Sequence, residues 1–212
     1  MTMIRLPGED TTALARDLIK RGEIIAFRTD TLYALGADPW SRKALQALNE
    51  LKGRGEGKPT SILISDEELV TDFIKRRTPL YELLSLNYFP GAITIIESAR
   101  DEVPLELTAN TGTIGVRVPA EAAVRDFVRA CGGALTATSA NLTGQPPSLT
   151  AQEVAAYFPE KLALIVDDGR ARTTSPSTII DISREVPRLL REGTILRESL
   201  EITLSRAGFV LA

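Results

Sequence analysis

Apolar residues recur every three or four positions in several segments of the chain, a spacing that predicts amphipathic helices. Short apolar runs lie between these segments and predict buried strands. The expected helices span residues 11–21, 41–52, 65–74 and 121–131, and a further one begins at Thr150. The expected strands span residues 23–27, 61–64, 92–96, 114–118, 134–138, 162–166 and 177–182. Helices and strands alternate, so the pattern predicts an α/β fold built on a partly parallel sheet.

Polar residues mark the beginnings of several of these helices. Ser41 can cap the second helix, whose apolar spacing places Lys52 at or just beyond its end. Capping-box sequences open two others, one from Ser65 to Glu68 and one from Thr150 to Glu153. The last residues, 202–212, fit either a final strand or an amphipathic tail.

Length and composition favour one domain that spans residues 1–212. A chain of 212 residues with 43% hydrophobic content can bury a substantial core, and its Gly and Pro residues do not gather into a linker. No apolar run approaches the roughly 20 residues that a membrane-spanning helix needs. We therefore expect a cytoplasmic protein without a membrane contact.

The charged residues, the absence of histidine and the lone cysteine limit the binding partners and catalytic mechanisms that the chain can have. The net charge is −3, which argues against a uniformly cationic surface for nucleic acid, so any anion site must be local. The chain has no histidine, which excludes Ser-His-Asp and Cys-His catalysis, and its one cysteine, Cys131, supports neither a zinc cluster nor a disulfide. We expect Cys131 to be a buried apolar residue, and we expect no protein-held metal.

The segment LKGRGEGKP, residues 51–59, carries the most concentrated positive charge. Lys52, Arg54 and Lys58 are spaced along a loop too rich in glycine to continue a helix, so all three can converge on one phosphate-bearing ligand. The spacing is wrong for a Walker A loop, and no GxGxxG motif follows the first strand. A solvated basic turn at the end of a helix would have the same pattern.

A second polar segment, TATSAN, ends an expected strand with Ser139 and Asn141. Side chains at strand ends of an α/β sheet often line the ligand crevice, although a plain turn would also use these residues. Arg117 lies inside the strand IGVRV and projects from the face opposite its valine neighbours. An arginine there needs an anionic partner unless that face is solvated.

The segment TDTLYALG, residues 29–36, follows the first strand and brings hydroxyl groups beside the sheet. Thr31 could help to hold a small polar substrate, although ordinary turn chemistry with Tyr33 packed on the core is the alternative. Ser177 and Arg191 repeat the theme of a polar group at a strand terminus.

In chain order, TDTLYALG, KGRGEGKP, TIGVRVP, TATSANLTGQPPS, STIID and LREGTI resemble the YrdC-like threonylcarbamoyl-adenylate synthase family. The resemblance runs from about Glu23 to Ile195, and its most specific element is the pair of K-x-R and S-x-N motifs. The chain departs from the family pattern at Arg28, where proline is usual, at Ala34, at Gly55 and at Leu63, where some relatives have histidine. It resembles the short form without an additional C-terminal domain.

The resemblance implies a twisted mixed α/β fold with a positively charged cavity. It implies a nucleotidyltransferase that makes threonylcarbamoyl-AMP and pyrophosphate from L-threonine, bicarbonate and ATP, with Mg²⁺ carried by the ATP. The product would serve tRNA modification by a downstream transferase complex, and a direct tRNA contact is possible. Carried over by position, Lys52 and Arg54 are catalytic, and Thr31, Arg117 and Ser177 contact threonine. The implied ATP contacts are Arg54, Lys58, Thr113, Ser139, Asn141, Ser148 and Arg191.

Two other functions fit the same residues. One is a relative that forms carbamoyl-adenylate from carbamoyl phosphate, which would share the fold and the nucleotide contacts. The other is an RNA-binding module that uses the basic cavity without catalysis, against which the net acidity weighs.

Overall fold

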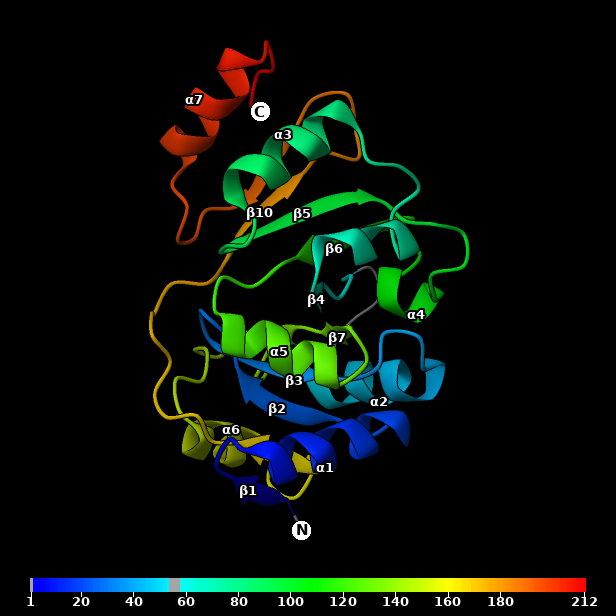
Figure 1. Ribbon diagram of the computed structural model, residues 1–212, viewed down its shortest axis with the longest axis vertical. Coiled ribbons are helices and arrows are strands. Elements are labelled where there is room, and N and C mark those ends of the chain that lie inside the picture. Colours follow the sequence, from blue (N-terminus) through cyan, green and yellow to red (C-terminus); the bar gives the residue numbers. More distant parts are fainter. Residues whose placement is uncertain (1, 54–57) are drawn as a thin grey trace.

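The computed structural model describes residues 2–53 and 58–212, whose strands form two mixed sheets arranged along the long axis of the molecule (Figure 1). The strand order is β1-β9-β2-β3-β8 in one sheet and β11-β10-β5-β6-β4-β7 in the other. The strands are β1 (Met3–Arg5), β2 (Ile25–Arg28), β3 (Tyr33–Gly36), β4 (Ile62–Ile64), β5 (Ile93–Ser98), β6 (Thr113–Arg117), β7 (Ala134–Thr136), β8 (Thr138–Ser139), β9 (Leu164–Val166), β10 (Thr178–Asp181) and β11 (Arg188–Arg191). The α/β class is confirmed, and the expected single sheet is divided in two.

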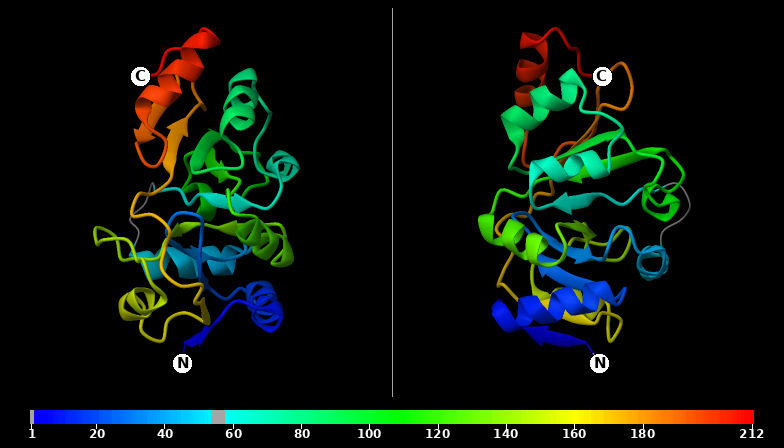
Figure 2. Two further views of the ribbon diagram at one scale, coloured as in Figure 1. Left: turned by 60° about the vertical axis from the view of Figure 1, so that its left-hand side comes forward. Right: turned by 45° about the vertical axis from the view of Figure 1, so that its right-hand side comes forward.

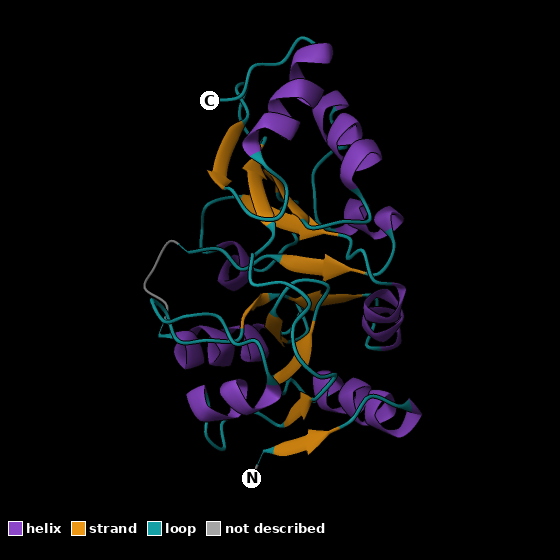
Figure 3. Cartoon of the chain, turned by 90° about the vertical axis from the view of Figure 1, so that its left-hand side faces the viewer, coloured by secondary structure: helices purple, strands orange, loops and turns teal. Residues whose placement is uncertain are grey.

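Helices flank both sheets (Figure 3). They are α1 (Glu9–Lys20), α2 (Arg42–Lys52), a 3₁₀ helix η1 (Glu67–Asp72), α3 (Pro79–Tyr88), α4 (Leu105–Thr108), α5 (Ala122–Ala130), α6 (Ala151–Tyr157) and α7 (Arg197–Arg206). The two ends of the chain lie at opposite ends of the molecule, with β1 at one end and α7 at the other (Figure 1).

Helices cover both faces of the five-stranded sheet, and successive side chains of β2 point to opposite faces. Ile25 and Phe27 pack in one core with α1 and α5. Ala26, between them, packs in the second core with α2 and α6. Strands β1, β9 and β2 are parallel, which explains why β2 reads as a continuous apolar run.

The six-stranded sheet has one core face and one open face. Ile95 and Val116, which are partners on β5 and β6, belong to the core that includes side chains of α3 and α7. The neighbouring residues Thr94 and Arg117 therefore point to the other face, toward the five-stranded sheet. That open face builds the site described below.

The chain passes from one sheet to the other where sequence periodicity predicts one strand over residues 134–138. Instead, β7 pairs with β4 in the six-stranded sheet, and β8 pairs with β3 in the five-stranded sheet. Thr136 N–H donates to the carbonyl of Ala37 (2.9 Å), and Ala137 N–H donates to the carbonyl of Ser61 (2.8 Å). These bonds to two different partners break the strand, so its continuity was wrongly predicted. The connections from β3 to β4 and from β9 to β10 also pass between the two sheets (Figure 2).

The helix expected over residues 65–74 is the short 3₁₀ helix η1, and its predicted capping box does not form. The Ser65 hydroxyl donates to the Asp66 carboxylate (2.8 Å), and Arg129 also binds that carboxylate. These side chains are therefore not available to cap the first turn. At Thr150 the predicted cap does form, because its hydroxyl accepts a bond from Glu153 N–H (3.2 Å). The undecided C-terminal segment begins in α7.

Candidate active site

A cavity of about 190 Å³ lies between the open face of the six-stranded sheet and the turn that follows β2. Its walls combine hydroxyl groups, two arginines and small apolar side chains. The residues that line it are Thr29, Thr31, Leu32, Tyr33, Ala34, Pro59, Ser61, Ile62, Leu63, Thr94, Arg117, Ala137, Thr138, Ser139, Pro176, Ser177, Ile179 and Arg191. Five of the predicted site residues are among them: Thr31, Arg117, Ser139, Ser177 and Arg191.

One cross-strand row of the six-stranded sheet forms a wall of this cavity. The register pairs Arg191 with Ile179 and Ile179 with Thr94. It also pairs Arg117 with Leu63. Ile95 and Val116 are partners in the antiparallel pair of β5 and β6, so Thr94 and Arg117 are the next opposed positions. Along this row, Ile179 and Thr94 therefore lie between Arg191 and Arg117.

Gly115 makes room for this arrangement. It lies on the cavity face of β6, two residues before Arg117. A Cβ atom at this position would be 2.7 Å from Ser61 Oγ and 2.9 Å from Thr94 Cγ2. Only glycine lets these two side chains approach the strand so closely.

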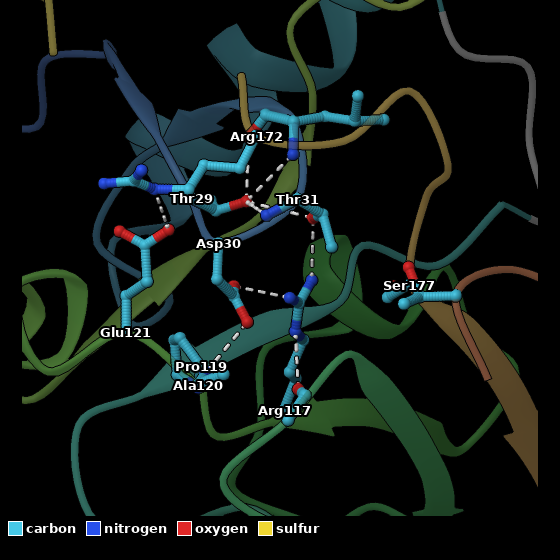
Figure 4. Close-up of polar contacts among 12 residues, drawn as sticks. Thr29, Asp30, Thr31, Arg117, Pro119, Ala120, Glu121, Arg172 and Ser177 are labelled. Atoms are coloured by element: carbon cyan, nitrogen blue, oxygen red, sulfur yellow. Dashed lines mark hydrogen bonds and ion pairs between the residues drawn. The ribbon is translucent and has the colours of Figure 1, made fainter. Parts of the chain in front are cut away.

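Arg117 is 5% exposed, so the alternative of a solvated guanidinium is wrong. Its Nη2 atom lies 2.5 Å from Asp30 Oδ1, and its Nε–H donates to the Gly91 carbonyl (3.0 Å). The second carboxylate oxygen of Asp30 accepts a bond from Ala120 N–H (2.8 Å), as Figure 4 shows. The sequence predicted an anionic partner for Arg117, and Asp30 of the same chain is that partner.

A chain of hydrogen bonds runs from Arg117 through the Thr31 hydroxyl to the Thr29 hydroxyl. Arginine can only donate, so Nη1 of Arg117 donates to the Thr31 hydroxyl (3.1 Å). The Thr29 hydroxyl donates to the Leu32 carbonyl (2.8 Å) and lies 3.1 Å from the Thr31 hydroxyl. Thr31 is thus left to donate to Thr29, and the orientation of each hydroxyl is fixed. Tyr33 packs in the core as one alternative predicted, and its own hydroxyl donates to the Gly169 carbonyl (2.6 Å).

Ser177 and Arg191 form a second polar group in the same cavity. Arg191 donates from Nε to the Ser177 carbonyl (2.9 Å) and from Nη2 to its hydroxyl (3.1 Å). The Ser177 hydroxyl also lies 3.1 Å from that of Thr94. Burial lowers the pKa of Arg191, and the nearby positive charge of Arg117 lowers it further. The cavity thus holds two cations close enough to repel each other.

Lys52, at the end of α2, binds backbone carbonyl groups of the S-x-N motif. Its Nζ donates to the Ser139 carbonyl (2.6 Å) and to the Asn141 carbonyl, and lies 3.4 Å from Asn141 Oδ1. Asn141 in turn donates from Nδ2 to the Gln145 carbonyl at 2.5 Å. Lys52 of the K-x-R motif therefore meets the S-x-N motif. It is 5% exposed and fixes the turn that carries Ser139, but it is not among the residues that line the cavity.

The predicted ATP contacts Lys58, Thr113, Asn141 and Ser148 are not among the residues that line the cavity. Ser148 is fully buried, and its hydroxyl donates to the Ala140 carbonyl in the same turn. Thr113 lies at the start of β6, with its hydroxyl 3.0 Å from that of Thr111. Lys58 is exposed and precedes Pro59, which lines the cavity. Arg54 lies outside the described residues.

Arg28 organises a charged network that sequence reasoning did not find. It is 6% exposed and donates in a fork to Glu121, with both bonds 3.0 Å long, and to Asp168. Burial alone would lower the pKa of Arg28, but the bonds to these two carboxylates outweigh it and raise the pKa. The bond from Arg28 lowers the pKa of Glu121, which also accepts from Arg172 (3.0 Å). The signals in the sequence were a charged residue directly after the apolar run IIAF and the departure at Arg28 from the proline that is usual in the family.

Arg28 therefore joins the turn that carries Thr31 to two other segments. Glu121 is the residue before the first turn of α5, and Asp168 lies in the connection from β9 to β10 that ends near Ser177. Figure 4 shows Glu121 and Arg172 beside the Thr29–Thr31 turn.

Among residues 2–53 and 58–212, no three His, Cys, Asp or Glu side chains are grouped so as to hold a metal ion. In the same ranges no helix has the length and apolar character required to cross a membrane. Cys131 is buried as expected, and burial raises the pKa of its thiol to about 12.

Two mixed sheets with flanking helices, and a cavity lined by hydroxyl groups, by the buried Arg117 and by the more exposed Arg191, define a protein of the α/β class with a candidate binding site. The Sua5/YciO/YrdC family model, described as "Telomere recombination", matches residues 17–193, and the chain belongs to this family.

Similar proteins support the assignment along most of the chain. A threonylcarbamoyl-AMP synthase of Pyrococcus abyssi is 32% identical over 89% of this chain and 55% of its own length. One of Bacillus subtilis is 31% identical over 91% of this chain and 56% of its own length. One of Idiomarina loihiensis is 35% identical over 81% of this chain and 93% of its own length. The chain thus spans about half the length of the first two of these relatives.

Solved structures share the fold. The structure of P. abyssi Sua5 complexed with L-threonine superposes with a TM-score of 0.92 at 28% identity, over 100% of this chain and 62% of that one. Escherichia coli YciO superposes with a TM-score of 0.82 at 24% identity, over 92% of this chain and 97% of that one, and this likeness shows the fold alone.

Replacing Gly115 by alanine should destabilise the protein by about 1–3 kcal/mol, because the added methyl group must displace Ser61 and Thr94. Urea unfolding measures this change in the free energy of unfolding. Gly8→Ala is the matched control, since its added Cβ would meet nothing within 4 Å. Equal stabilities of the two variants would contradict the close packing at Gly115.

Replacing Arg28 by methionine should cost about 2 kcal/mol of stability, less than for a fully buried pair, because Asp168 and Glu121 retain partial contact with water. Arg172→Met removes another arginine from Glu121, but the Arg172 side chain is 69% exposed, so its loss should cost under about 0.5 kcal/mol. Thermal unfolding of both variants checks this difference. Similar losses would show that burial of Arg28 does not matter.

Proposed function

We propose that this chain makes threonylcarbamoyl-AMP and pyrophosphate from L-threonine, bicarbonate and ATP. The observation that carries the proposal is the meeting of two predicted groups in one cavity. Thr31, Arg117 and Ser177, expected to contact threonine, line it together with Ser139 and Arg191, expected to contact ATP. The names of the similar proteins support the same reaction.

Arg117 is suited to the carboxylate of threonine. In the described part of the chain, bonds to Asp30, Thr31 and Gly91 engage one N–H each on Nη2, Nη1 and Nε. A guanidinium has five N–H groups, so one on each terminal nitrogen is left for a ligand. The Thr31 and Ser177 hydroxyls complete a polar surface around it.

The reaction needs no protein nucleophile. The amine of threonine attacks carbon dioxide with release of a proton, or bicarbonate with loss of water, and gives a carbamate. A carbamate oxygen then attacks the α-phosphorus of ATP. The bond from this phosphorus to the bridging oxygen breaks, and pyrophosphate leaves with the electron pair. The residues here would align two anionic reactants and stabilise the charge that develops, which are the tasks of Lys52, Arg54 and Arg191 in this proposal.

Mg²⁺ would arrive on the phosphates of ATP. Cations and hydroxyls dominate the polar lining of the cavity, and the nearby carboxylate of Asp30 already binds Arg117 and Ala120. This donor set fits a magnesium ion that keeps its waters and phosphate ligands, in place of one held by protein carboxylates. The ion would neutralise charge on the leaving pyrophosphate.

The remaining parts of the proposal follow from the product. A threonylcarbamoyl group activated as an adenylate must be transferred to an acceptor, which we propose is tRNA, through a separate transferase complex. Such a protein would work in the cytoplasm, where the transferase complex acts on tRNA. The proposal includes a direct contact between this protein and RNA.

Purified protein incubated with L-threonine, bicarbonate, ATP and Mg²⁺ should yield threonylcarbamoyl-AMP and an equal amount of pyrophosphate, as measured by mass spectrometry and a pyrophosphate assay. A parallel reaction with carbamoyl phosphate replaces threonine and bicarbonate. Pyrophosphate in that reaction alone would assign the chain to carbamoyl-adenylate formation. Tight, salt-dependent RNA binding without either product would indicate the RNA-binding module.

Arg117→Lys should raise the KM for threonine about tenfold or more and change the KM for ATP little. Lysine keeps a positive charge opposite Asp30 but lacks the planar fork that can bind a second carboxylate. Steady-state kinetics with each substrate varied in turn measures the effect. Arg129→Lys, on the exposed side of α5, is the control and should leave both constants unchanged. An unaltered threonine KM in the Arg117 variant would remove Arg117 from the proposed role.

A further inference from the structure

Thr94 is a buried residue in the wall of the cavity to which neither the sequence motifs nor the proposed reaction gives a task. It is 3% exposed, and it lies on β5 between Ile179 of one neighbouring strand and Arg117 of the other. Its hydroxyl is 3.1 Å from the Ser177 hydroxyl. Thr94 thus faces the two cations and the serine that the proposed reaction uses.

Counting protons shows what this hydroxyl pair can offer. Ser177 accepts a bond from Arg191, because arginine can only donate. The two hydroxyls share one further hydrogen bond, which uses one of their two protons. If Ser177 donates to Thr94, the Thr94 proton remains. If Thr94 donates to Ser177, the Ser177 proton remains. In both cases this pair keeps one O–H that their shared bond does not use.

The charges around the pair select the kind of partner for that O–H. Arg191 and Arg117 lie at the two sides of Thr94 and Ile179 in the same cross-strand row. Arg117 is balanced by Asp30, whereas the bonds that Arg191 makes in the described ranges go to the neutral Ser177. Since the repulsion between the arginines falls when an anion lies between them, the row favours a negatively charged oxygen.

We propose that Thr94 is a substrate-binding residue. In this proposal Arg191 donates to Ser177, Ser177 donates to Thr94, and Thr94 donates its O–H to an anionic oxygen of the amino-acid substrate held between Arg117 and Arg191, because each donated bond strengthens the next in such a chain. The inference rests on the proposed function and adds a residue to its amino-acid subsite. The oxygen belongs to the amino acid in place of the nucleotide because Thr94 is opposite Arg117 on the adjacent strand and is buried with it. The oxygens of the threonine carboxylate, and of the carbamate formed on its amine, have the required charge.

Two substitutions separate the hydroxyl of Thr94 from its shape. Thr94→Val has nearly the same volume and lacks the hydroxyl, whereas Thr94→Ser keeps the hydroxyl and lacks the methyl group. Calorimetric titration of each purified variant with L-threonine, and separately with ATP, measures both affinities. A hydrogen bond from a neutral donor to a charged acceptor is worth about tenfold or more in affinity. We expect Thr94→Val to bind threonine at least about tenfold more weakly than wild type, and Thr94→Ser to remain within about threefold.

The ATP titrations and a control variant complete the test. ATP affinity should stay within about twofold in both Thr94 variants. Thr11→Val is the control for loss of a buried hydroxyl far from the cavity, because Thr11 donates to the Leu6 carbonyl (2.8 Å) in α1, and it should bind threonine like wild type. If thermal unfolding shows that Thr94→Val does not fold, Thr94→Ala replaces it against the same serine variant.

Equal threonine affinities of the valine and serine variants would overturn the inference while leaving the proposed function in place. A loss of ATP affinity as large as that of threonine affinity would also overturn it, because the oxygen would then belong to the nucleotide. If wild-type protein binds no threonine and makes no threonylcarbamoyl-AMP, the proposed function fails and this inference fails with it.

Discussion

The buried ion pair between Arg117 and Asp30 is the interaction on which the site depends. Arg117 ends β6 of the six-stranded sheet, and Asp30 lies in the turn after β2 of the five-stranded sheet, so the pair joins the two sheets across the cavity. Both side chains are at most 6% exposed. Removing two charges from water costs about as much as their attraction returns, so we attribute to the pair a role in orientation more than in net stability. It fixes the guanidinium and the Thr31 hydroxyl in one geometry.

Much of the fold could be predicted from the sequence because it depends on local periodicity. The apolar spacing of α1, α2 and α5 and the runs that form β5, β6 and β10 place those elements within a few residues. The division into two sheets could not be predicted in this way. It depends on the backbone of Thr136 and Ala137 bonding to Ala37 and Ser61, which are distant in sequence. The 3₁₀ helix η1 likewise depends on Arg129, a tertiary partner that competes for Asp66.

The candidate site shows the same limit. Motif spacing identified Thr31, Arg117, Ser139, Ser177 and Arg191, which the structure brings together around one cavity. The sequence did not identify their partners Asp30 and Thr94, or the neighbouring Arg28, because none of these three residues has a spacing signature of its own. Arg28 in particular is meaningful only once Glu121 and Asp168, from two other parts of the chain, are beside it. Position along a strand predicted that Arg117 needed an anion, but it could not name Asp30.

The most direct test of the central claim is a crystal structure of this chain with L-threonine bound. The account predicts that the threonine carboxylate lies within 3.2 Å of Arg117, the usual reach of a hydrogen bond from nitrogen to oxygen, and that the ligand fills the cavity beside Thr94 and Ser177. Threonine bound elsewhere on the molecule, with water in this cavity and the Arg117–Asp30 pair unengaged by the ligand, would contradict it.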